Sequence, residues 1–386
     1  MRSRSHSVLA AIIGLATPFQ LQFGGILYAS EAILALVAIW ALATRLIDGR
    51  FWRPPFTRLL MFLGVSLLAY AVTDMAVGTD PANSLRGWAR LVFLGSNLTG
   101  LYFLCRRMPF NLLIYAISSA AGSLVFLACD ARLFEDWKFG ASAPLTVLVA
   151  CLIPLLVPRG VLVGSIALTA VGILHLVLDS REIGGNCLLA GALLAARCFS
   201  LLRWKSISWI LLTGLASVGV GLFLWAYMLT DAEYSQRRHF SNAWRTASLI
   251  TAADAIADSP WLGNGSQTNN FALQSQYDSI FAEHTGIRYR GQMTDTSTFS
   301  PHSQILQSWF EAGVFGTTFF IYLGFAVAGA LYFCIFRRQL DAFSVLFAFS
   351  LMRAIWHLLF SPFAGLARLD VALAGAIVCV IGIERS

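Results

Sequence analysis

Long apolar runs separated by short polar stretches make up most of this sequence. A run of about 20 apolar residues is long enough to cross the hydrocarbon core of a bilayer as a helix. No convincing A-x-A cleavage site follows the first run, so we expect a retained span rather than a signal peptide. The pattern predicts an all-α polytopic membrane protein with about 12 transmembrane helices, near residues 7–22, 25–44, 58–75, 88–104, 110–129, 142–157, 161–178, 184–201, 207–229, 311–335, 341–360 and 369–383.

One long polar segment separates the ninth apolar run from the tenth. It carries helix signals, because Ser241 can cap a helix that Ser259-Pro260 stops, and Gly263-Asn264-Gly265 then predicts a turn. We expect one membrane domain in three parts: helices 1–9 at residues 1–229, a large partly helical loop at 230–303, and helices 10–12 at 304–386.

The charged residues predict the orientation of these spans. Lys and Arg outnumber Asp and Glu by 27 to 20, and basic residues flank membrane spans on the cytoplasmic side. If the N-terminus is cytoplasmic, every connection on its side carries basic residues, among them Arg45, Arg106, Arg159, Arg203 and Arg338. The opposite side collects acidic residues, among them Asp74, Asp130, Asp179 and Glu182. We therefore expect both termini in the cytoplasm and the long loop on the outer side.

The composition argues against several classes of protein. Charged residues make up 12% of the chain, against about 25% in soluble domains. No basic stripe with interleaved aromatic residues indicates a nucleic-acid partner. Seven cysteines lie in or beside apolar runs without a CxxC pair, which argues against a disulfide framework and a zinc site. No P-loop occurs, and we expect neither a metal nor another cofactor.

A histidine at the end of the long loop is the first candidate for chemistry. Ser300 and Pro301 predict the start of a helix, with Ser300 as its N-cap and His302 in its first turn. The positive end of a helix dipole disfavours imidazolium, so a neutral His302 could act as a general base. Gln304 and Glu311 continue a polar stripe down the same helix. The alternative is a loop histidine without a role.

Two arginines on the outer side are candidate anion ligands. Arg181 lies at the boundary of the eighth span, and Arg245 lies in the first helix of the long loop. The planar guanidinium group suits phosphate oxygens, although such residues can equally be interfacial anchors or solvated surface groups. Ionisable residues inside spans are also suspects, but the pattern assigns no role to Glu31, His175, Arg353, His357 and Asp370.

Several short motifs together resemble the O-antigen ligase and O-antigen polymerase family, the Wzy-like glycosyltransferases of bacterial cell-surface polysaccharide assembly. The resemblance covers about residues 165–335, and the motifs that carry it are Ser180-Arg181, Pro260-Trp261-Leu262-Gly263-Asn264-Gly265, His302-Ser303-Gln304-Ile305-Leu306-Gln307 and Glu311-Ala312-Gly313-Val314-Phe315-Gly316. Two positions depart from the family pattern. Glu182 stands where a glycine often follows the Ser-Arg pair, and Ser303 stands where an asparagine often follows the histidine.

The resemblance implies a metal-independent glycosyltransferase on the periplasmic side of a bacterial inner membrane. Its donor would be a glycan linked to undecaprenyl pyrophosphate, and Arg181 and Arg245 would bind the pyrophosphate. His302 would deprotonate a hydroxyl of the acceptor, with Gln304 and Glu311 in supporting positions. The acceptor would be lipid A-core sugar for a ligase, or another lipid-linked glycan for an O-antigen or exopolysaccharide polymerase. Membrane lipid, a flippase and a chain-length regulator would be further partners.

Other functional classes remain open at this level. A 12-span secondary transporter is the chief alternative, although no pair of matching broken helices appears in the two halves of the sequence. A metal-dependent lipid-phosphate-sugar transferase would typically carry acidic residues in its first outer loop, which here has none. A structural partner of a flippase is the third alternative.

Overall fold

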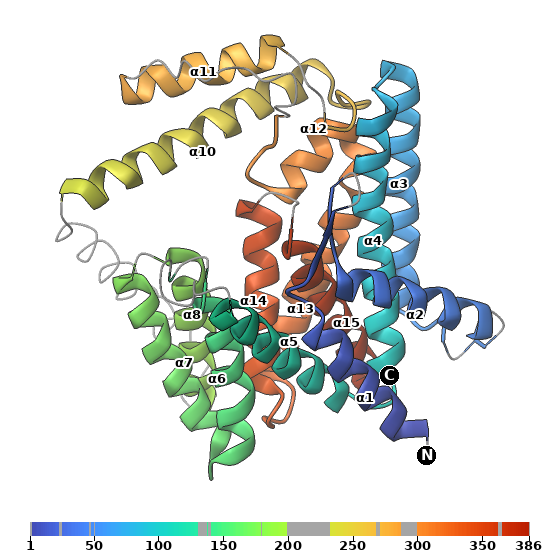
Figure 1. Ribbon diagram of the computed structural model, residues 1–386, viewed down its shortest axis with the longest axis vertical. Helices are drawn as coiled ribbons and strands as arrows, with labels where there is room; N and C mark the ends of the chain where they lie inside the picture. Colours follow the sequence, from blue (N-terminus) through green and yellow to red (C-terminus); the bar gives the residue numbers. More distant parts are fainter. Residues whose placement is uncertain are drawn as a thin grey trace.

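The computed structural model describes residues 2–22, 25–45, 48–49, 51–129, 137, 140–178, 180–198, 232–267, 271–286, 299–361 and 365–385. Helices dominate these residues (Figure 1). They are α1 (Arg2–Leu15), α2 (Ala29–Arg45), α3 (Phe56–Val77), α4 (Pro81–Cys105), α5 (Phe110–Cys129), α6 (Ser142–Leu156), α7 (Gly160–Val177), α8 (Arg181–Cys198), α10 (Ala232–Asp258), α11 (Phe271–Thr285), α12 (Gln304–Gly316), α13 (Thr318–Phe336), α14 (Ser344–Phe360) and α15 (Ala367–Arg385), with the strands β1 (Gln20–Gln22) and β2 (Ile26–Tyr28).

Most of these helices lie within the apolar runs of the sequence, whereas α10 and α11 lie in the long polar segment. Four helices of the described residues, α3, α5, α7 and α13, are long and apolar enough to cross a membrane. These are the helices of an all-α, multi-pass membrane protein. The predicted ninth span at 207–229 lies outside the described residues, and the count of twelve spans stays a prediction.

The first two predicted spans are wrong where they meet. The run at 7–22 is helical only as far as Leu15, and β1 then pairs antiparallel with β2, with Gln20 opposite Tyr28. Pro18 explains the stop, because a proline disfavours helical backbone at the residue before it. Gln20-Leu21-Gln22 then alternates polar and apolar residues with the period of a strand. With 14 residues, α1 is about 21 Å long, shorter than the ~30 Å hydrocarbon core.

A buried ion pair joins α2, directly after this hairpin, to the C-terminal helix α15. The guanidinium of Arg368 donates to both oxygens of Glu31 at 2.9 and 2.8 Å, and to the carbonyl of Ile26 at 3.1 Å. Asn97 of α4 donates to the same carboxylate at 3.0 Å. A buried ion pair is tolerated when further hydrogen bonds satisfy its members, as here. Glu31 therefore has a structural role.

His175 also has a structural role, between α6 and α7. The indole nitrogen of Trp137 can only donate, so Nδ1 of His175 accepts this hydrogen bond at 3.0 Å. Nε2 consequently carries the proton and donates to the hydroxyl of Thr146 at 2.7 Å. That hydroxyl donates in turn to the carbonyl of Ser142 at 2.8 Å. The chain of hydrogen bonds leaves His175 no free lone pair for chemistry.

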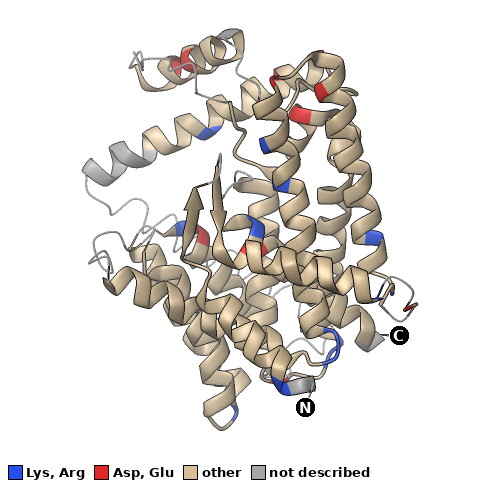
Figure 2. Ribbon diagram, turned by 45° about the vertical axis from the view of Figure 1, so that its right-hand side comes forward, with Lys and Arg blue, Asp and Glu red and all other residues tan. Residues whose placement is uncertain are grey.

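The helices of the long loop and the chain termini lie at opposite ends of the molecule. α10 and α11 lie at one end, and both chain termini lie toward the other (Figure 1). Near the termini, Arg45 and Arg106 both contact Asp48, at 3.7 and 3.8 Å. Arg368 pairs with Glu31 and Arg353 pairs with Asp370 inside the molecule. Figure 2 shows that Lys or Arg (blue) and Asp or Glu (red) lie next to each other at places within the helical body.

Candidate functional site

The helix that follows His302 begins later than its sequence predicts. Its N-cap is Ser303, not Ser300, and the Ser303 hydroxyl accepts a hydrogen bond from the backbone N–H of Leu306 at 3.3 Å. The same hydroxyl donates to the carbonyl of Leu358 in α14 at 3.1 Å, and this contact selects Ser303 as the cap. Serine and asparagine are both good N-caps, so capping of α12 explains why a small polar residue follows His302. His302 thus precedes the helix instead of lying in its first turn.

The imidazole of His302 is half-buried beside α10. Its backbone N–H donates to the hydroxyl of Ser248 at 3.3 Å. Nδ1 of the ring is buried and has no hydrogen-bond partner in the described part of the chain. Burial and the positive charge of Arg245 lower the pKa of His302 below its ordinary value. The ring is therefore neutral near pH 7 and able to accept a proton.

The structure brings Arg181 and Arg245 into the same neighbourhood. Arg181 is the first residue of α8, and Arg245 is an exposed residue of α10. Arg245 interacts electrostatically with Arg181 and Glu182, and His302 with Arg245. Two guanidinium groups beside a helix N-terminus form an arrangement suited to an anion such as phosphate. The three candidate residues therefore converge from α8, α10 and the segment before α12.

Glu311 is the centre of a buried network rather than a free carboxylate. Nη2 of Arg90 lies 2.7 Å from both of its oxygens. The carboxylate also accepts from the hydroxyl of Tyr70 at 2.8 Å, the amide of Gln307 at 3.3 Å and the backbone N–H of Gln267 at 3.1 Å. With these donors in place, Glu311 joins α3, α4 and the turn after α10 to α12. It supports the site structurally.

The Pro-x-x-Gly-x-Gly motif docks against a break in α12. At Ala312 and Gly313 the backbone leaves the helical conformation, and Gly313 has a φ of 64°. The backbone N–H groups of Asn264 and Gly265 donate to the carbonyls of Phe310 and Glu311 at 2.8 and 3.0 Å. A side chain on Gly313 would come within 2.0 Å of the carbonyl oxygen of Trp261. The two glycine motifs are thus one packing unit, which fixes the break in α12.

Gln304 keeps free hydrogen-bonding capacity next to His302. It is fully buried, and neither its amide oxygen nor its amide nitrogen has a partner in the described residues. An unpaired buried amide is costly, and such a group needs an explanation. This unpaired amide belongs to the second residue after His302 in the chain.

Four further ionisable residues, spread over three helices, form a network that sequence reasoning did not assemble. Arg353 and His357 of α14 both contact Asp370 of α15, at 3.1 and 3.2 Å. Both also face Glu182 of α8, at 3.9 and 3.8 Å. The position of Arg353, His357 and Asp370 inside apolar runs was the available signal, but the contacts among the four residues depend on the packing of α8, α14 and α15.

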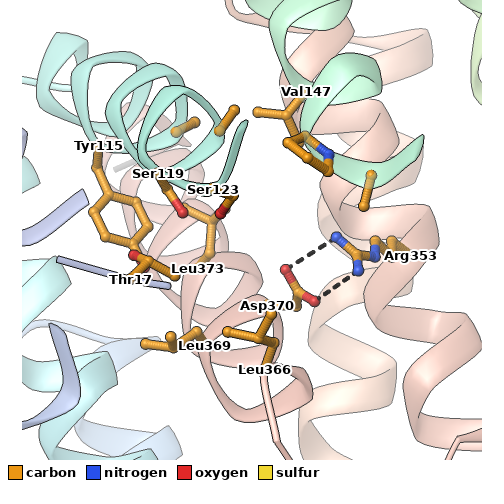
Figure 3. A pocket seen from close by; sticks show the side chains of 14 residues that line it. Thr17, Tyr115, Ser119, Ser123, Val147, Arg353, Leu366, Leu369, Asp370 and Leu373 are labelled. Atoms are coloured by element: carbon orange, nitrogen blue, oxygen red, sulfur yellow. Dashed lines mark hydrogen bonds and ion pairs between the residues drawn. The ribbon is translucent and has the colours of Figure 1, made fainter. Parts of the chain in front are cut away.

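The Arg353–Asp370 pair also borders a cavity of about 100 Å³. Figure 3 shows the pair on one side of this space, opposite the hydroxyl-bearing residues Tyr115, Ser119 and Ser123 of α5. Glu182 and His357 do not line the cavity. Arg353 and Asp370 therefore separate it from the part of the network next to Arg181.

Comparison with known proteins agrees with the motifs. No curated protein matches the chain significantly. The family model described as O-Antigen ligase matches residues 144–321, a segment that contains Arg181, Arg245, His302, Gln304 and Glu311. This match supports an O-antigen ligase or polymerase activity in general, carried by a membrane-embedded glycosyltransferase that acts on a lipid-linked glycan. The resemblance of this chain to the O-antigen ligase and polymerase family is thereby confirmed over residues 144–321.

Proposed function

We propose that this chain transfers a glycan from undecaprenyl pyrophosphate to a sugar hydroxyl on the periplasmic side of the inner membrane. Arg181 and Arg245 bind the pyrophosphate, aided by the N-terminal N–H groups of α8. His302 is the general base, and Gln304 binds a hydroxyl of the acceptor. Positive charge from the two arginines stabilises the leaving group, so the proposal needs no metal ion.

The chemical step is a single displacement. His302 takes the proton of the acceptor hydroxyl, and the oxygen of that hydroxyl attacks the anomeric carbon of the donor. The bond from this carbon to the pyrophosphate oxygen breaks, and its electron pair leaves with undecaprenyl pyrophosphate. Attack opposite the leaving group inverts the anomeric configuration. Cleavage of the phosphoester bond supplies the free energy of transfer.

One observation carries the proposal: His302 lies near Arg245, which in turn lies near Arg181. The positive charge of Arg245 helps to lower the pKa of His302, and Arg245 interacts with Arg181 in turn. The reaction requires a neutral base, which takes the proton of the acceptor hydroxyl, and positive charge, which stabilises the leaving pyrophosphate.

The experiment is transfer from a purified lipid-linked donor by His302→Ala. General base catalysis contributes about 10²–10⁴-fold, so the rate should fall by this factor. The variant should elute as folded protein in gel filtration, because His302 lies outside the apolar spans. His284→Ala, which removes an exposed histidine of α11, is the matched control and should keep the wild-type rate.

Parallel assays define the acceptor and the metal requirement. Lipid A-core and a second lipid-linked glycan, offered separately, distinguish a ligase from a polymerase. A chelator should leave the rate unchanged. A folded His302→Ala protein with a near wild-type rate would remove the general base from this site and contradict the proposal.

A further inference from the structure

Glu182 differs from the other groups of the candidate site because it links the donor side to the membrane helices. It directly follows Arg181 in the first turn of α8. One of its oxygens, Oε1, lies 3.9 Å from Nε of Arg353 and 3.8 Å from Nδ1 of His357. Both nitrogens are buried, and neither has a hydrogen-bond partner in the part of the chain that the structure describes. Glu182 therefore supplies negative charge to two buried polar atoms of α14.

Asp370 fixes the direction in which these two nitrogens point. Its oxygens contact Nη1 and Nη2 of Arg353 at 3.2 and 3.1 Å, and the same carboxylate contacts Nε2 of His357 at 3.2 Å. Figure 3 shows the two-pronged contact with Arg353. Asp370 of α15 thus holds the Nη atoms of Arg353 and Nε2 of His357. Nε of Arg353 and Nδ1 of His357 are left facing Glu182 of α8. Such a bidentate contact constrains orientation as well as distance.

The same turn of α14 also holds the histidine side of the site. Leu358, next to His357, accepts the hydrogen bond of Ser303, the residue after His302. Glu182 in addition interacts electrostatically with Arg245. Arg181 and Arg245 carry like charges and repel each other, and the negative charge of Glu182 offsets this repulsion at Arg245. One turn of α14 therefore contacts both the start of α8, which carries Arg181, and the segment that carries His302.

We propose that Glu182 is a positioning residue: anchored by Arg353 and His357, it holds the first turn of α8, and with it Arg181, in the place where Arg181 binds the donor pyrophosphate. The inference rests on the proposed function. It concerns a position where this chain departs from the pattern that it resembles, since a glycine has no side chain to make these contacts. Glu182 touches neither donor nor acceptor in this scheme and acts through Arg181.

The test is the kinetics of Glu182→Gln, which keeps the shape of the side chain and removes its charge. The KM for the lipid-linked donor should rise about 3- to 30-fold, the usual coupling between contacting residues, while kcat and the acceptor KM stay within about twofold. Glu182→Asp should restore part of the affinity. Glu283→Gln, at an exposed position of α11, is the matched control and should leave all three constants unchanged.

A second variant changes His357, the partner of Glu182 on α14. His357→Asn should raise the donor KM by a similar factor, and the double variant should be no worse than the stronger single variant, because both changes break one connection. An unchanged donor KM in either folded variant overturns the inference, as does a double variant whose effects multiply. Normal transfer by both Arg181→Lys and His302→Ala would instead contradict the proposed function itself. The two failures are therefore distinguishable.

Discussion

At the scale of single residues, the protonation of His302 can be tested through pH. Its pKa is lowered by burial and by the charge of Arg245, so the neutral, active base persists below the ordinary histidine value of about 6.5. The rate should therefore stay constant from pH 8 through neutrality and fall only in acid. Arg245→Gln removes a charge that opposes imidazolium, so the acid limb should move to higher pH. Transfer measured at saturating donor between pH 5 and 8 checks both statements.

Arg86→Gln provides the control for this profile. Arg86 is an exposed arginine at the start of α4, and its loss should leave the acid limb where it is in the wild type. A shift of the Arg245→Gln limb to lower pH would contradict the assigned interaction, because the sign follows from Coulomb repulsion alone. Equal shifts in the two variants would point to a change of net charge instead.

The sequence could predict individual residues better than their contacts. His302, Arg181 and Arg245 stand in or beside recognisable patterns, and the structure places them together. The network of Glu182, His357 and Asp370 could not be predicted in this way. Its residues lie on α8, α14 and α15, and hydropathy does not show which helices pack against one another. The N-cap shows the same limit. Ser300 and Ser303 are chemically equal candidates, and only the Leu358 carbonyl, a tertiary contact, distinguishes them.

At the scale of elements, the break in α12 is the feature that hydropathy did not predict. The apolar run at 311–335 predicts one continuous span, but the backbone leaves the helical conformation at Ala312 and Gly313, and α13 begins only at Thr318. Continuous hydrophobicity carries no information on backbone dihedral angles. The cause is Gly313, whose positive φ and close approach to Trp261 require a residue without a side chain.

Gly313→Ala tests this account of the break. Positive φ costs an L-residue about 1–2 kcal/mol, and the clash with the Trp261 carbonyl adds to this, so the variant should lose ~2 kcal/mol or more of stability. Thermal unfolding in detergent measures the loss as a lower midpoint. Gly329→Ala is the matched control in α13, where an added Cβ meets no atom within 4 Å, and its midpoint should be unchanged or slightly higher. Equal midpoints for the two variants would contradict the packing role of Gly313.

At the scale of the whole molecule, apolar runs predicted the helical architecture because lipid imposes helices on any spanning segment. They did not predict the hairpin of β1 and β2, which is too short to interrupt a hydropathy window. They also could not show that Glu31 and Arg368, far apart in the chain, neutralise each other inside the fold. Length and polarity are local properties, whereas pairing between buried charges is decided by how the helices pack.

Orientation in the membrane is the property on which the proposed chemistry depends most, because the donor glycan is presented on the periplasmic face. Reporter fusions after Arg45, Arg106, Arg203 and Arg338 should report cytoplasm, since basic connections remain inside. A fusion near Gly286, at the end of α11, should report periplasm. Arg45 and Arg106 both contact Asp48, so the connections that carry them lie on the same side of the molecule. Helix α11 lies at the end opposite the chain termini (Figure 1). Arg203 lies outside the described residues, so its fusion tests the predicted ninth span. Cytoplasmic signal at Gly286 would place Arg181, Arg245 and His302 on the wrong side of the membrane for transfer from a periplasmic donor.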